Sequence, residues 1–219
     1  MQRFELIERA SQMNSYLLFV SLLSLTFIAY ARMSTPDALS LSWKRFWKLS
    51  RAESFGFDDE KIRPETQTLF LGNFLISFSL STYLFLLDHF QRLEALVFMF
   101  ALVLGFLIFQ LLNFRLALFL TDNMKLVSGI AEINKQVWSF AGLAYLGLSF
   151  LWLIYGQANH LLQYVFVLLF VAAYVWRLVK AWRACLQANL EWYYLILYLC
   201  ALEILPILFV WRWFSGEYN

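Results

Sequence analysis

This chain contains a series of long apolar stretches, and their length limits the folds that it can adopt. A helix that spans a bilayer needs about 20 mostly apolar residues. Six stretches approach this length: 15–31, 69–87, 95–120, 137–155, 161–178 and 192–211. Apolar residues make up 62% of the chain, against roughly half in globular proteins, so a soluble core of 219 residues could not bury them. We therefore predict an all-α integral membrane protein, a single domain over 1–219 with six crossings.

Basic residues are distributed unevenly among the connecting loops. Lys and Arg are retained on the cytoplasmic side of membrane proteins, so they indicate orientation. Twelve lie in the first, third and fifth loops: Arg32, Lys44, Arg45, Lys48, Arg51, Lys61, Arg63, Lys125, Lys135, Arg177, Lys180 and Arg183. The opposite side carries only Arg3, Arg9, Arg92 and Arg212. With an even number of crossings, this asymmetry predicts that both termini are periplasmic.

The first cytoplasmic loop, 32–68, is the only sizeable polar segment. Thr35 can cap a helix that has Pro36 in its first turn. The helix carries Trp43, Phe46 and Trp47 at helical spacing, with Lys44, Lys48 and Arg51 pointing elsewhere. Such an amphipathic helix lies flat on an anionic leaflet, and the alternative is a helix packed on the protein's own loops. The acidic part that follows, 55–66, is predicted to be an exposed loop.

Glu203 is the most informative single residue, because charged side chains in the hydrocarbon region are costly and are usually paired or functional. It lies near the middle of the last stretch, and Pro206, which can kink the helix, follows it. Tyr198, Cys200, Glu203 and Pro206 thus mark an intramembrane polar site. It can act as a proton or ion relay, or it can be a structural carboxyl that bonds to a neighbouring helix. We favour the structural interpretation.

Arg115 is the candidate partner of Glu203, with Gln110 and Asn113 about a turn earlier on the third stretch. The depths of Arg115 and Glu203 in the membrane are both measured from the cytoplasmic face. A long guanidinium side chain could span the difference between them and reach the carboxyl. The alternative is that Arg115 extends its charged end to the interface.

The remaining polar residues indicate packing more than chemistry. His89 and His160 fall in short non-cytoplasmic loops, with Asp88 and Glu94 near the first, and a metal site there is the alternative to ordinary loop histidines. We favour ordinary loop histidines, because the ligands are few. Ser77 and Ser81 are four residues apart on the second stretch, and small residues, Ala141, Ala144 and Gly147, occur on the fourth. Such residues let helices approach closely.

Catalytic and cofactor motifs are absent from the sequence. Cys185 and Cys200 have no ligand spacing, and a net charge of +2 does not indicate a nucleic-acid surface. We expect no cofactor, no metal, no nucleic-acid partner and no enzymatic activity.

The last stretch, from Tyr194 to Leu208, resembles the closing signature of a family of bacterial multi-pass membrane proteins typical of Bacteroidota. This family is a domain of unknown function, number 4271. The resemblance is strongest around Tyr198, Cys200, Glu203 and Pro206. It implies a bacterial inner membrane, and it brings no activity, cofactor or substrate.

Two classes of function fit this sequence. An accessory or scaffold subunit of a larger inner-membrane complex, serving envelope biogenesis or protein export, needs only helices, lipid contacts and a docking loop such as 43–65. A small transporter or ion- or proton-coupled subunit would use Glu203 near the bilayer midplane, but few polar residues are available to line a path. We favour the subunit, whose partners would be the lipid bilayer and other membrane proteins.

Overall fold

A computed structural model gives the arrangement of the chain. It describes residues 2–47, 63–86, 93–121, 124–155 and 160–187. All regular structure in these ranges is helical: α1 (Gln2–Ser34), α2 (Ala38–Trp47), α3 (Pro64–Leu86), α4 (Leu93–Thr121), α5 (Met124–Tyr155) and α6 (His160–Gln187). Five of the helices contain segments long and apolar enough to cross a membrane, and α2 is the short exception.

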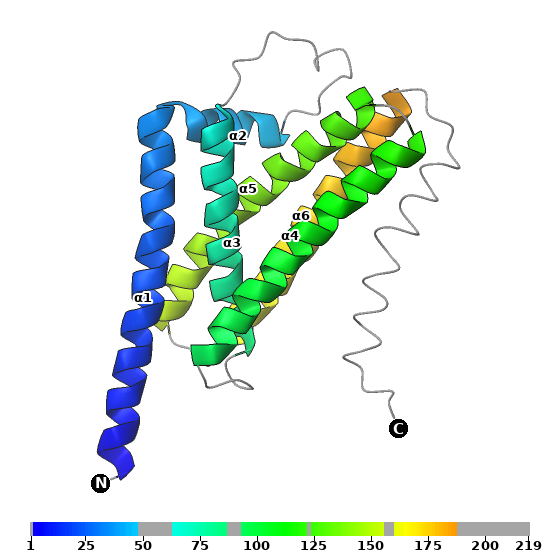
Figure 1. Cartoon of the computed structure of the whole chain (residues 1–219). Helices are drawn as coiled ribbons and strands as arrows, with labels where there is room; N and C mark the ends of the chain where they lie inside the picture. The colour runs from blue at the N-terminus through cyan, green and yellow to red at the C-terminus, as the bar shows by residue number, and fades with distance from the viewer. Residues whose placement is uncertain (1, 48–62, 87–92, 122–123, 156–159, 188–219) are drawn as a thin grey trace, which may run out of the picture.

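The long helices form one bundle in which successive helices alternate in direction (Figure 1). Helices α3 and α5 run in the same direction through its centre, with α5 inclined across α3, and α1, α4 and α6 run in the opposite direction on the outside. Burial follows this order, because 56% of the apolar segment is buried in α3 and in α5, but only 22% in α1, 17% in α4 and 22% in α6. The short helix α2 lies across one end of the bundle.

The central pair is held together by aromatic packing around a close backbone contact. Phe74 of α3 stacks on Phe78 and lies 5.2 Å from the Trp138 ring of α5. Gly142 of α5 faces the backbone of Phe74, and a Cβ atom added there would lie 2.7 Å from the Phe74 Cα. A glycine at this position therefore allows α3 and α5 to touch.

The membrane-length segments agree with five of the predicted crossings. They are Ser15–Ser34, Pro64–Leu86, Ala95–Asn113, Val127–Tyr155 and His160–Ala184. The sixth predicted crossing, 192–211, lies outside the described residues. The third stretch, 95–120, lies within one unbroken helix, α4, over Leu93–Thr121.

Several helices extend beyond the predicted ranges into polar sequence, as α1 does by beginning at Gln2 and α6 by ending at Gln187. Helix α3 begins at Pro64, inside the predicted loop 32–68, and α5 begins at Met124 instead of near 137. Thr66 is fully buried in α3 instead of lying in an exposed loop. Val127, Ile130 and Ile133 supply α5 with a buried face despite the polar residues between them, and this amphipathic pattern sustains the helix.

The outer faces of the bundle are strongly apolar. Large side chains are exposed on all three outer helices: Phe19 and Leu22 on α1, Val97, Phe98, Leu111 and Leu112 on α4, and Leu161, Leu168 and Val171 on α6. Soluble monomers rarely expose contiguous apolar patches of this extent. This surface is the one expected of helices solvated by lipid or by other membrane helices.

Candidate functional site

Five buried polar side chains gather along one face of α3, and we call them the polar seam. Asn73, Ser77 and Ser81 belong to α3, Ser24 belongs to α1 and Ser149 belongs to α5. The three α3 members recur at intervals of four residues and so share one helix face. All five side chains are fully buried. The Ser24 hydroxyl of α1 donates to Asn73 Oδ1 at 2.5 Å, and its oxygen lies 2.9 Å from the Ser77 hydroxyl. The seam thus joins α1 to the central helix.

Toward the C-terminal end of α3 the seam joins α3 to α5. The Ser81 and Ser149 hydroxyls lie 2.8 Å apart, and each also lies within hydrogen-bond distance of the Tyr145 carbonyl. Backbone carbonyls of a helix accept such extra bonds without losing their own partner. Asn73 to Ser81 covers eight residues, or about 12 Å along the axis. The seam is therefore an internal structure of the bundle core.

A second polar group connects α4 to α5. Gln110 Oε1 accepts from Asn134 Nδ2 at 2.8 Å and from the Trp138 indole N–H at 3.0 Å. The same indole N–H lies 2.8 Å from Asn134 Oδ1. All three residues are buried. In a lipid environment, where the apolar surface gives little preference for one helix neighbour, bonds of this kind specify which helices meet.

Further hydrogen bonds join the helices at the end of the bundle that α2 covers. Thr35, just after α1, has its hydroxyl 3.0 Å from that of Thr66 in α3. Gln67 Nε2 of α3 donates to Glu132 Oε1 of α5 at 2.6 Å. The Thr35 carbonyl accepts the Ala38 N–H at the start of α2, so Thr35 fixes the turn into α2 through its backbone, while its hydroxyl contacts α3.

Three buried polar atoms have no hydrogen-bond partner among the described residues. They are Asn73 Nδ2, the Tyr145 hydroxyl and the Trp152 indole nitrogen. Asn73 belongs to the polar seam, whereas the Tyr145 and Trp152 rings pack near Phe166 of α6. An unpaired buried donor costs about 1–3 kcal/mol, so these atoms mark the positions where the described core retains unused hydrogen-bonding capacity.

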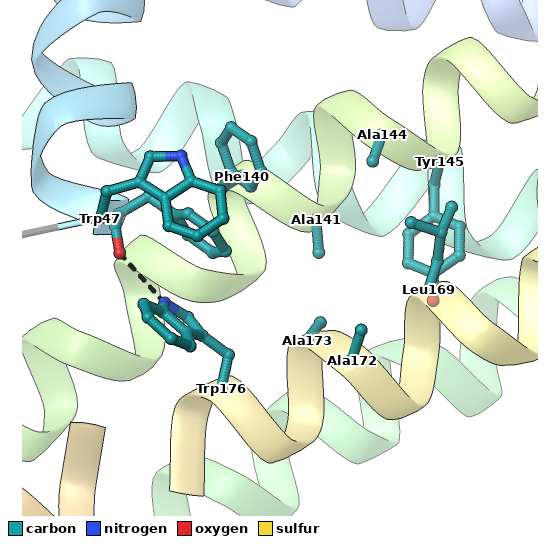
Figure 2. Close-up of a pocket in the computed structure, with 10 residues that line it drawn as sticks. Trp47, Phe140, Ala141, Ala144, Tyr145, Leu169, Ala172, Ala173 and Trp176 are labelled. Carbon is teal, nitrogen blue, oxygen red and sulfur yellow. Dashed lines mark hydrogen bonds between the residues drawn. The ribbon is translucent and has the colours of Figure 1, made fainter. Parts of the chain in front are cut away.

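An apolar cavity of about 210 Å³ lies between α5 and α6 under the end of α2 (Figure 2). Alanines form its walls, Ala141 and Ala144 from α5 and Ala172 and Ala173 from α6, and Phe46 and Trp47 of α2 close one end. We call it the α5–α6 cavity. The Trp176 indole N–H donates to the Phe46 carbonyl at 3.0 Å and anchors α2 over it.

Helix α2 packs on the bundle through its aromatic residues, of which Phe46 is the most deeply buried. The Trp43 ring lies 5.3 Å from that of Phe140, and the Trp47 ring lies 5.5 Å from that of Trp176. Phe46 is 8% exposed and stacks on Phe140 at 4.1 Å, whereas Trp43 and Trp47 are about half exposed. Lys44 is exposed. The predicted alternative of packing against the protein itself therefore holds for Phe46, although the surface it meets belongs to α5 and α6 instead of to loops. Lys48 and Arg51 lie outside the described residues.

The intramembrane polar site predicted around Glu203 falls outside the described residues, together with Tyr198, Cys200 and Pro206. Its proposed partner Arg115 is exposed on α4, and Asn113 is half-buried two residues before it. Gln110, grouped with them from the sequence, is bonded to α5 instead. The pairing of Arg115 with Glu203 thus stays a prediction.

The sequence also singled out two histidines and Gly147. His160 is the exposed first residue of α6, with a ring nitrogen 3.3 Å from Gln163 Oε1, and His89 is not described. Among the described residues there is no group of three or more His, Cys, Asp or Glu side chains that could hold a metal ion. Gly147 is open, since nothing described lies within 4 Å of an added Cβ. The close approach of helices expected there occurs at Gly142.

Sequence reasoning missed three features of the site. Asn73 was not singled out, although its spacing to Ser77 and Ser81 was available as a signal. The bonding of Gln110 to Asn134 and Trp138 joins residues 24 and 28 positions apart. The α5–α6 cavity depends on which alanines of two helices face each other, and no pattern within one helix indicates that.

Five membrane-length helices with polar groups paired inside and apolar side chains outside define a multi-pass helical membrane protein. A family model described as "Domain of unknown function (DUF4271)" matches residues 17–214, and the chain belongs to that family. The match confirms the family resemblance predicted from the Tyr194–Leu208 stretch. No curated protein and no solved structure matches the chain.

Proposed function

We propose that this protein is a non-enzymatic accessory or scaffold subunit of a larger complex in the bacterial inner membrane, one serving envelope biogenesis or protein export. The observation that carries the proposal is the contrast between the core and the outer faces. The buried polar side chains mostly bond to one another, while α1, α4 and α6 present long apolar faces. A bundle of this kind offers helices as binding surfaces and needs no reacting group.

The proposed topology has six crossings with both termini periplasmic. Arg32 lies in the last turn of α1, Lys44 in α2 and Arg63 just before α3. These helix ends lie at the same end of the bundle as the C-terminal end of α6, which carries Arg177 and Arg183 (Figure 1). Clustering of basic residues at one end supports a cytoplasmic location for that end. Helix α2 would then lie at the cytoplasmic interface, with Trp43, Lys44 and Trp47 toward the headgroups.

The alternative function is transport coupled to protons or ions through Glu203. It requires a polar path across several helices, and Asn73, Tyr145 and Trp152 supply unused donors in the core. Against it, the α5–α6 cavity is lined by apolar side chains, and the seam hydroxyls are already paired. We therefore favour the accessory subunit.

The proposal is tested by purifying the full chain with whatever binds it, and by comparing the wild type with variants of its exposed helix faces. Purification from the native membrane in a mild detergent should recover at least one other membrane protein in fixed stoichiometry. Paired variants on exposed α4 positions, Val97→Ser with Leu111→Ser, should release the partner if it binds that face, and Phe19→Ser with Leu22→Ser tests α1 in the same way. Solute movement by the purified protein in liposomes, without any partner, would instead support transport.

A further inference from the structure

We propose that the α5–α6 cavity binds one acyl chain of an anionic phospholipid, with the phosphate held near Lys180 at the end closed by α2. This inference requires only that the bundle be in a membrane, and it does not depend on the accessory role.

The lining of the cavity suits a hydrocarbon chain. Its residues are alanine, leucine and aromatic side chains, and the four alanines leave space between α5 and α6 that larger side chains would fill. The lining runs along α6 from Leu169 to Trp176, about 10 Å at the helical rise. Ligand sites for compact small molecules are usually larger, about 300–1,000 Å³, so a cavity of about 210 Å³ fits a chain segment better than a globular ligand.

The rim of the cavity opens on the outer surface of the bundle. Ala172 is exposed, and Trp47 is 51% exposed, although both line the cavity. A lipid chain can therefore enter sideways from the surrounding leaflet without passing through the core. No residue of the polar seam lines the cavity, although Tyr145, whose carbonyl accepts from Ser149, does.

The charge at the closed end complements a phosphate. Lys180 Nζ lies 5.7 Å from the centroid of the Phe46 ring, which itself lines the cavity. Arg177 precedes Lys180 by three residues on α6, and Arg183 follows it. Helices α2 and α6 contain no Asp or Glu. The charged side chains that these two helices supply at this end are all basic, as at other basic lipid sites near the cytoplasmic face. Arg177 and Lys180 are each 6% exposed, and Arg183 is exposed.

The test is native mass spectrometry of the full chain offered equal amounts of phosphatidylglycerol and phosphatidylcholine with identical acyl chains. We expect one retained lipid per protein, with phosphatidylglycerol favoured at least five-fold. Ala144→Leu with Ala173→Leu should fill the cavity and reduce retention at least ten-fold. Ala101→Leu, the same chemical change on the exposed face of α4, should leave retention unchanged.

Two further measurements separate the effect of the Lys180 charge from the occupancy of the α5–α6 cavity by lipid. Lys180→Gln should keep the lipid but lose the preference for phosphatidylglycerol, and Lys180→Arg should restore it. If the double alanine variant does not fold, quenching of Trp176 and Trp47 fluorescence in the wild-type protein by acyl-brominated phosphatidylglycerol, compared with Trp176→Phe, tests the same contact.

Three results would overturn the proposal. They are no retained lipid, equal retention by the filled variant and by Ala101→Leu, or no change in headgroup preference in Lys180→Gln. A photoreactive side chain at Ala172 provides a direct check of the occupant. Cross-linking to phospholipid supports the proposal, whereas cross-linking to residues 192–211 or to a second copy means that protein covers the cavity.

Discussion

Replacing Gly142 by alanine should destabilise the bundle more than any other single-methyl change in α5. The added Cβ would lie 2.7 Å from Phe74 Cα and 2.9 Å from Phe74 N, and both are backbone atoms that no side-chain rotation can move. Ordinary contact begins near 3.4 Å, so α3 and α5 must separate by about 0.7 Å. Phe74 also packs on Trp138, and this contact would loosen with it.

The expected loss of stability in Gly142→Ala follows from two opposing effects. Overpacking a well-filled core costs about 1–3 kcal/mol, and replacing glycine by alanine in a helix returns up to about 1 kcal/mol. We expect a net loss of about 1–2 kcal/mol in the free energy of unfolding. For a chain of this size each kcal/mol lowers the melting temperature by about 2–4 °C.

Gly147 supplies the matched control on the same helix. Nothing described lies within 4 Å of a Cβ added there, so Gly147→Ala should be neutral or slightly stabilising. The assay is thermal unfolding of the purified variants in one detergent, followed by intrinsic tryptophan fluorescence. Equal melting temperatures for Gly142→Ala and Gly147→Ala would refute the close contact between α3 and α5.

Three further predictions concern the polar seam, α2 and the last stretch. Asn73→Ala should cost about 1–2 kcal/mol in detergent unfolding, because two serine hydroxyls lose an acceptor, whereas Thr26→Ala, which removes an exposed hydroxyl, should cost less than about 0.5 kcal/mol. Phe46→Ala should increase proteolysis and hydrogen exchange of Ala38–Trp47 well beyond the effect of Trp43→Ala, and equal protection in the two variants would exclude Phe46 as the anchor. Glu203→Ala should lower the melting temperature while Glu203→Gln retains it, and wild-type stability in both would exclude a buried polar role.

The sequence was sufficient for the broad architecture, because the length of an apolar stretch reports directly on whether a helix can cross a bilayer. It was less reliable at helix ends. Thr66 and Gln67 resemble loop residues, yet Thr35 and Glu132 bond to them across the bundle, and the helix continues. Such partners are distant in sequence, so local composition could not reveal them.

The candidate site illustrates the same limit. Ser77 and Ser81 were recognisable as packing residues because helix periodicity places them on one face. Their partners Ser24 and Ser149 come from two other helices, and only the folded bundle identifies them. Gly142 and Gly147 look equivalent in sequence, and what distinguishes them is the backbone of Phe74 facing one and open space beside the other.

The most direct test of the proposed role is the composition of the particle that contains this protein in its own membrane. Extraction into polymer nanodiscs without detergent, followed by affinity capture and mass measurement, would preserve both lipids and partners. An accessory subunit should appear in a particle well above its own 25.9 kDa, with another membrane protein in constant ratio to it. Recovery of the chain alone, with lipid and no other protein, would contradict the proposal.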